Sequence, residues 1–354
     1  MRHEFASLGS LRAKHLHIRP SGLSLLPRRC HRWNSSNSTP AQDPIIFSGI
    51  QPTGVPHLGN YLGALHQWVK LQQDATEGTK LFFSIVDLHA LTVPQDPVQL
   101  RKWRKEAFAT LLAVGLDPKR STIFYQSGVP AHTELMWILS TVASMGYLSR
   151  MTQWKSKLQL PDDATLDDST ARAQLRLGLF SYPVLQAADI LVHRATHVPV
   201  GEDQRQHLEF SRYTANSFNH LYGPIFPIPE ALISPAKRLK FAKKVKVALT
   251  DSEANITYDP THRPGVSNLI EILSHLEGVS CEEIATDFHS ASLRSLKEHV
   301  ADRIAYHLQE IRDRYITIME DQTGYLESVA EEGAEAARAN SRVTMQQIRD
   351  TMGL

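Results

Sequence analysis

A short apolar run that breaks into a glycine- and proline-rich turn constrains this chain most. Residues 45–50 read Ile-Ile-Phe-Ser-Gly-Ile, residues 51–56 read Gln-Pro-Thr-Gly-Val-Pro, and a helical pattern opens at His57. A strand, a turn and a helix in this order place a helix N-terminus where a phosphate chain can sit. His57 would stand on the first helical turn, and Gly59 would let a ribose or adenine ring approach the backbone. A strand, turn and helix with no ligand is the alternative interpretation.

An acidic residue inside an apolar helical run is the second feature. Residues 185–191 read Leu-Gln-Ala-Ala-Asp-Ile-Leu, and Val-Pro-Val-Gly-Glu-Asp-Gln follows at 198–204. An ionised carboxylate at Asp189 is costly in such a setting unless it has a partner, and an indole N–H is a suitable donor. An aspartate that caps a neighbouring helix is the alternative.

The first 42 residues differ in charge from the rest of the chain. They hold seven Arg or Lys residues, seven serines and one acid, Glu4, whereas the whole chain has a net charge of +1. This basic, serine-rich, acid-poor profile is typical of a cleaved mitochondrial transit peptide. A basic tail that touches nucleic acid is the competing interpretation. No apolar run in the sequence is long enough to span a bilayer, so no membrane partner is expected.

Cysteine and histidine usage argues against a metal centre. The two cysteines are Cys30, inside the predicted transit peptide, and Cys281. One remaining cysteine permits neither a disulfide framework nor a thiolate zinc site. His193 and His197 could share a helix face as an i, i+4 pair, but the pair lacks the glutamate of a metalloprotease motif. Solvated or packed histidines are therefore the favoured interpretation.

Strands alternate with helices through the first two thirds of the chain. This alternation predicts an α/β fold with a doubly wound, Rossmann-like parallel sheet, and a ligand at the carboxyl ends of the strands. After about Leu249 only helical patterns remain, which predicts a C-terminal all-helical domain. The expected strands are 45–50, 81–86 and 121–125, and the expected helices are 61–71, 100–112, 133–147, 187–192, 204–219, 268–276, 293–311 and 330–352.

The two motifs together resemble a known family. The tetrapeptide from His57 to Asn60, His-Leu-Gly-Asn, resembles the "HIGH" signature of class I aminoacyl-tRNA synthetases, and Gly-Ile-Gln-Pro-Thr-Gly at 49–54 is similar to the tryptophanyl branch. The resemblance implies that L-tryptophan reacts with ATP to give an adenylate and pyrophosphate, followed by transfer to tRNA(Trp). It also implies Mg²⁺ that accompanies ATP without a protein-ligand site, a homodimer, and, with the leader, the mitochondrial matrix. Tyrosyl synthetases share the implied fold.

Site residues follow from the same resemblance, position by position. The matching Asp189 implies selection of tryptophan through the indole N–H. Lys157 matches the second lysine of a segment that reaches the ATP phosphates. The implied catalytic residues are His57, Asn60 and Lys157; those for ATP are Gln51, Pro52, Thr53, Gly59, Asn60, Gly201, Glu202 and Asp203; and those for tryptophan are Asp189, Phe47, His89, Tyr182, Gln186 and Gln204.

One element implied by the resemblance is absent. The family has a second signature, Lys-Met-Ser-Lys-Ser, between flanks that resemble residues 235–238 and 243–253, and only Leu-Lys-Phe-Ala separates these flanks here. The expected organisation is a transit peptide and linker at 1–42, a catalytic domain at 43–238, a junction with the deletion at 239–246, and a helical tRNA- and anticodon-binding domain at 247–354. A catalytically impaired splice form or relative that binds tryptophan or tRNA without efficient activation is the alternative function.

Overall fold

The computed structural model describes residues 43–354, except His57, Asp162, residues 202–203, residues 234–249, Ser252 and Ala254. The predicted transit peptide at 1–42 and the predicted junction at 239–246 therefore lie outside the described residues.

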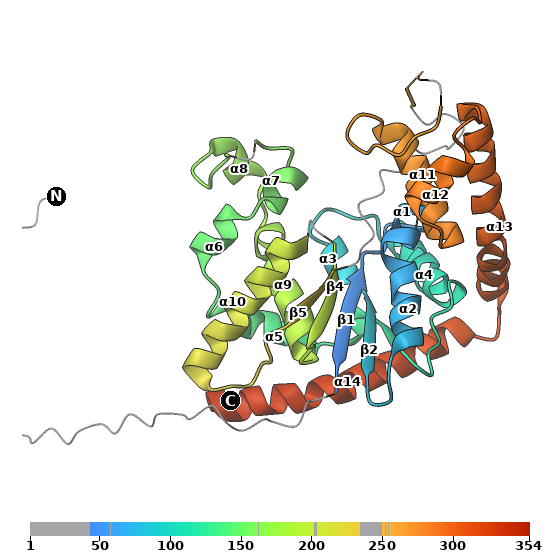
Figure 1. Cartoon of the computed structure of the whole chain (residues 1–354). Helices are drawn as coiled ribbons and strands as arrows, with labels where there is room; N and C mark the ends of the chain where they lie inside the picture. The colour runs from blue at the N-terminus through green and yellow to red at the C-terminus, as the bar shows by residue number, and fades with distance from the viewer. Residues whose placement is uncertain are drawn as a thin grey trace, which may run out of the picture. The chain divides into compact units, whose positions relative to one another are not determined.

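Five strands in the described residues form one parallel sheet in the order β3-β2-β1-β4-β5 (Figure 1). The order reverses direction between β1 and β4, as in a doubly wound sheet, so the predicted fold class is confirmed. The strands are β1 (Ile45–Ile50), β2 (Lys80–Ile85), β3 (Thr122–Tyr125), β4 (His197–Val200) and β5 (Glu230–Ile233).

The sequence analysis identified β1, β2 and β3 but not β4 and β5. These two strands have four residues each, and β4 contains Pro199, a residue type that argues against a strand in the interior of a sheet. Pro199 nevertheless lies in register with Leu232 of β5. Tertiary pairing thus overrides a local signal that favours a turn.

Helices cover both faces of the sheet. Successive side chains of a strand point to opposite faces, so Phe82 packs in one core and Phe83 in the other. The Phe83 side holds the helical segment α1 (Leu58–Asn60), η1 (Tyr61–Leu65) and α2 (His66–Asp74), together with α4 (Pro97–Ala113). The Phe82 side holds α5 (Ala131–Ser140), α9 (Leu177–Val192) and α10 (Arg205–Tyr222).

The predicted helix at 133–147 is wrong in one respect, because two helices replace it. α5 ends at Ser140, and α6 (Met145–Arg150) begins after Ser144, whose side chain accepts a hydrogen bond from the backbone N–H of Tyr147. A serine at an N-cap starts a new helix by satisfying a free N–H group, so the chain changes direction here. The other short segments are α3 (Asp87–Ala90), η2 (Gln126–Gly128), α7 (Gln153–Lys157) and α8 (Ser169–Gln174).

The described residues from 250 to 354 contain helices and no strand, which confirms the predicted helical C-terminal region. α13 packs against α4 and α11, whereas α14 turns back to lie against β3 and α5, below the sheet in Figure 1. None of the described helices is both long and apolar enough to cross a membrane. The helices of this region are α11 (Pro264–Glu277), α12 (Cys281–Asp287), α13 (Leu293–Glu320) and α14 (Tyr325–Met352).

The close approach of α14 to the sheet gives a first prediction. A Cβ atom added at Gly333 would collide with the backbone carbonyl of Ile123 in β3. We expect Gly333→Ala to lower the free energy of unfolding by about 1–3 kcal/mol, the usual cost of overpacking, although alanine favours a helix. Gly178→Ala is the matched control, because a Cβ at this helical position meets none of the described residues within 4 Å. Chemical denaturation of both variants is the measurement. An unchanged free energy of unfolding in Gly333→Ala would contradict this packing.

Candidate active site

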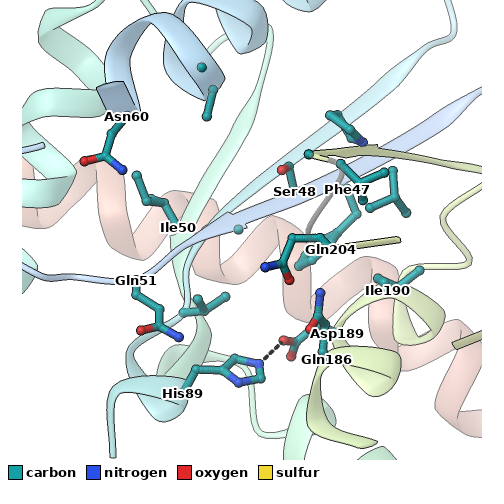
Figure 2. Close-up of a pocket in the computed structure, with 18 of the residues that line it drawn as sticks. Phe47, Ser48, Ile50, Gln51, Asn60, His89, Gln186, Asp189, Ile190 and Gln204 are labelled. Carbon is teal, nitrogen blue, oxygen red and sulfur yellow. Dashed lines mark hydrogen bonds and ion pairs between the residues drawn. The ribbon is translucent and has the colours of Figure 1, made fainter. Parts of the chain in front are cut away.

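A cavity of about 380 Å³ lies at the carboxyl ends of β1 and β4 (Figure 2). Its volume is in the range of small-molecule sites. β1 contributes residues 47–50, Gln51 directly follows it, and β4 contributes residues 198–200 to its walls. The cavity therefore occupies the point where the strand order reverses, the place predicted for a ligand in a doubly wound sheet.

Most of the residues implied by the sequence resemblance meet in this cavity. In Figure 2, Gln51 and Asn60 lie on one side and Phe47 and Ile190 on the other, with Gln204 between them. Pro52, Thr53 and Gly59 are described but are not among the lining residues, and His57, Glu202 and Asp203 lie outside the described residues. The implied residues that line the cavity are Phe47, Gln51, Asn60, His89, Lys157, Tyr182, Gln186, Asp189, Gly201 and Gln204.

Asp189 is the electrostatic centre of the cavity. It lies in α9 and is 1% exposed. Its Oδ2 atom is 2.9 Å from Nε2 of His89, and its Oδ1 atom is 2.7 Å from both Nδ1 of His132 and Nε2 of Gln126. Burial alone would raise the pKa of Asp189, but the hydrogen bonds from His132 and His89 outweigh burial and hold the pKa below its usual range. The carboxylate is therefore ionised at neutral pH.

The hydrogen bonds of Asp189 leave room for one more donor. The backbone N–H of Leu88 donates to Oε1 of Gln126 at 3.1 Å, which orients the amide so that its NH₂ group faces Asp189. A carboxylate accepts about four hydrogen bonds, and in the described structure three side chains fill three of these positions. The remaining position suits an N–H group of a ligand. Because these partners are side chains, Asp189 does not cap a neighbouring helix.

A second set of hydrogen bonds fixes the wall of the cavity beside Asp189. The ring of Tyr182 meets His89 edge to face, with centroids 5.5 Å apart, and its hydroxyl is 2.6 Å from Nε2 of His207. Nδ1 of His207 is 3.1 Å from Oε1 of Gln204. Two of the residues implied to contact the amino acid, Tyr182 and Gln204, are thus held through a histidine that the sequence analysis did not identify.

The other end of the cavity has the groups that a nucleotide needs. Gln51 and Asn60 lie at this end in Figure 2, and Gln67 and Lys157 are further residues that line the same cavity. Gly63 of η1 also lines it, and a Cβ at Gly63 would meet no atom within 4 Å, so a planar ring has access to the helix here. Within the described ranges, no group of three or more His, Cys, Asp or Glu side chains could hold a metal ion.

The sequence analysis missed two partners of Asp189. Gln126 directly follows β3, so the rule that ligand-facing groups follow parallel strands could have found it. His132 lies in α5, and no local pattern distinguishes it from a core residue. The idea that His193 and His197 share a helix face is wrong, because α9 ends at Val192 and β4 begins at His197. His193 is fully buried, which confirms the packed interpretation for that residue.

Comparison with known proteins agrees with this geometry. Residues 39–241 match the family described as tRNA synthetases class I (W and Y). The mitochondrial tryptophan–tRNA ligase of Schizosaccharomyces pombe is 43% identical over 344 residues, which cover 87% of this chain and 95% of the relative. The mitochondrial enzyme of Saccharomyces cerevisiae is 42% identical and covers 87% of this chain and 90% of its own length. The chain therefore belongs to the class I tRNA synthetase family for tryptophan and tyrosine.

Solved structures give the same result. Tryptophanyl-tRNA synthetase of Mycoplasma pneumoniae is 27% identical, with a TM-score of 0.75 over 88% of this chain and 98% of that chain. The Campylobacter jejuni enzyme, solved with ADP and tryptophan, is 28% identical, with a TM-score of 0.68 over 88% of this chain and 100% of that chain.

Proposed function

We propose that this chain is a tryptophan–tRNA ligase, which activates L-tryptophan with ATP and charges tRNA(Trp). The observation that carries the proposal is the buried, ionised carboxylate of Asp189, which has one acceptor position left and lies in the cavity at the switch point of the sheet. The two yeast relatives, both mitochondrial tryptophan–tRNA ligases, support it.

The proposed roles divide the cavity into two ends. At one end Asp189 accepts the indole N–H, while Phe47, His89 and Tyr182 enclose the ring. Leaving a buried acceptor unpaired rejects amino acids without a suitable donor better than pocket size can. Gln186, Gly201 and Gln204 complete the amino-acid site.

At the other end the chain stabilises the negative charge of the triphosphate. Formation of an adenylate demands little covalent help and much charge stabilisation. We assign this task to His57, Asn60 and Lys157, and to Mg²⁺ that arrives with ATP. The residues assigned to the nucleotide from the sequence motifs are Gln51, Pro52, Thr53, Gly59, Asn60, Gly201, Glu202 and Asp203.

ATP–pyrophosphate exchange tests the function. In a chain that carries the second signature, so that rates are high enough to measure, we expect exchange with tryptophan and none with tyrosine, the substrate of the other branch of the family. Equilibrium binding of tryptophan and tyrosine to the same preparation accompanies the assay, because binding does not depend on the rate of activation. Failure to bind tryptophan, or equal exchange with tyrosine, would overturn the assignment.

The remaining partners are proposed from the same resemblance. The helical region at 247–354 would bind the tRNA. A homodimer would cover apolar side chains of α5 and α6 such as Trp137 and Met145, which are 74% and 62% exposed. Both the dimer and the tRNA-binding surface are open to measurement by sedimentation and by tRNA(Trp) binding.

The proposed location is the mitochondrial matrix, and the leader gives a second prediction. Residues 1–42 fused to a fluorescent reporter should direct it to mitochondria, because their basic residues alternate with apolar ones and permit a basic amphipathic helix. Microscopy and protease protection of isolated mitochondria are the measurements. A matched fusion in which Arg12, Lys14 and Arg19 are replaced by glutamine should stay in the cytosol. Cytosolic fluorescence of the unmodified fusion would contradict the transit peptide.

A further inference from the structure

Two buried histidines have no role in the proposed function, although they lie directly behind Asp189. His132 and His193 are both 0% exposed. Nδ1 of His132 is 2.7 Å from Oδ1 of Asp189, and its Nε2 is 3.2 Å from Nε2 of His193. Nδ1 of His193 is 2.9 Å from Oδ1 of Asn340, a residue of α14. A continuous line of hydrogen bonds therefore joins the carboxylate in the cavity to the C-terminal helix.

With Oδ1 of Asn340 facing His193, as the structure places it, the hydrogen bonds along this line have one consistent set of directions. The amide oxygen of Asn340 accepts, so Nδ1 of His193 carries a proton and donates it. A neutral imidazole then has only an acceptor at its other nitrogen, so Nε2 of His193 accepts from Nε2 of His132. His132 also donates from Nδ1 to Asp189. His132 thus carries protons on both nitrogens and faces Asp189 as an imidazolium.

The surroundings of His193 keep its ring neutral and in one orientation. The ring stacks on Phe82, with centroids 4.5 Å apart and planes at 14°, and on Phe47 at 5.7 Å and 19°. Burial and the positive charge of His132 lower the pKa of His193 to about 3, although the hydrogen bond to Asn340 acts in the opposite direction. A neutral His193 agrees with the proton count.

α14 also holds the segment that supplies two of the three donors to Asp189, Gln126 and His132. Arg338 donates to the carbonyl oxygen of Gly128 at 2.8 Å, and Arg349 forms a two-pronged ion pair with Glu134. Gly128 and Glu134 stand just beyond Gln126 and on either side of His132 in the sequence. Gln126, His132 and the backbone that carries them are therefore braced by the same helix that holds His193 through Asn340.

We propose that α14 takes part in recognition of the amino acid: Asn340, acting through His193, is a positioning residue that keeps His132 doubly protonated and directed at Asp189. The proposal deepens the proposed function and depends on it. An imidazolium beside Asp189 keeps the buried carboxylate ionised. The indole N–H requires this ionised form as its acceptor. Without the acceptor at position 340, His193 can turn its proton toward His132, and His132 then becomes neutral.

Three variants of the full chain test this inference. Asn340→Leu keeps the size of the side chain and removes the acceptor, whereas Asn340→Asp restores an acceptor. Gln347→Leu is the matched control, because Gln347 accepts from Arg194 at 3.1 Å and links α14 to the neighbour of His193 without touching the buried line. We expect Asn340→Leu to weaken tryptophan binding about 3- to 10-fold, the usual effect of one lost hydrogen bond, with ATP binding unchanged. Asn340→Asp and Gln347→Leu should bind tryptophan like the unmodified chain.

Nitrogen-15 spectra of the histidine rings give a second readout that packing alone would not change. In the unmodified chain, His132, assigned by its loss in His132→Gln, should have protons on both nitrogens, and in Asn340→Leu it should be neutral. A neutral His132 in the unmodified chain overturns the proposal, even where a variant does not fold. If Gln347→Leu and Asn340→Leu weaken tryptophan binding equally, the proposal is also overturned, because both substitutions would then act by disturbing the docking of α14. If the unmodified chain does not bind tryptophan, the proposed function itself is overturned instead.

Discussion

Replacing Asp189 with alanine is expected to lower kcat/KM for tryptophan by roughly 30-fold or more, which corresponds to at least ~2 kcal/mol. The indole N–H loses its acceptor, and the donors from His89, His132 and Gln126 are left without theirs. The ratio of tryptophan to phenylalanine activation should fall with it, since phenylalanine has no donor. Pyrophosphate exchange is the measurement, made in a chain that carries the second signature so that rates are high enough to compare.

Loss of folding must be separated from loss of recognition in this experiment. Gln72 provides the matched control, because it is also a buried polar side chain, 4% exposed, with three hydrogen bonds, to Gly115, Asp117 and Ser121, and it is not among the residues that line the cavity. Gln72→Ala should lower stability while leaving the preference for tryptophan unchanged. Asp189→Asn, which keeps the shape, should reproduce the loss of preference. Unchanged kinetic constants in Asp189→Ala would show that another group reads the indole.

The sequence predicted those parts of the fold that local patterns determine. The run at 45–50 is apolar and ends at glycine and proline, and it forms β1 over those same residues. Asp189 could be identified because a carboxylate in an apolar helix needs a partner, whatever the partner is. In both cases the physical reason acts within one short stretch of the chain, because glycine and proline end a strand and an unpaired carboxylate destabilises an apolar helix. One stretch of sequence is therefore enough for each prediction.

The partners of Asp189 depend on the tertiary structure instead. His89, His132 and Gln126 stand 100, 57 and 63 positions away in the sequence and reach the carboxylate from α3, α5 and η2. Asn340 comes from the last helix, whose docking against β3 no periodicity reveals. β4 was missed for a related reason, because pairing with neighbouring strands outweighs the preference of Pro199 for a turn.

The deletion that we propose between residues 238 and 243 leads to the largest expected effect. A family-type Lys-Met-Ser-Lys-Ser segment inserted between Arg238 and Lys243 should raise the rate of tryptophan-dependent pyrophosphate exchange by roughly 10⁴-fold. The pyrophosphate leaving group gains hydrogen bonds from the lysines and backbone N–H groups of that signature, which stabilise its negative charge. One preorganised donor is typically worth ~10²–10³ in rate, and two independent donors account for about 5 kcal/mol of barrier.

Tryptophan binding should respond much less to the same insertion, since the residues around the indole are present without it. Asp189, Phe47 and Tyr182 line one cavity in the described structure. The contrast between a large change in rate and a small change in tryptophan affinity therefore separates the leaving-group end of the site from the amino-acid end. An insertion of equal length with both lysines replaced by alanine controls for the added chain, and it should restore little of the rate. Equal and substantial exchange in the original and lengthened chains would show that the gap does not disable activation, and that Lys157 and the basic residues from Lys237 to Lys246 stabilise the pyrophosphate on their own.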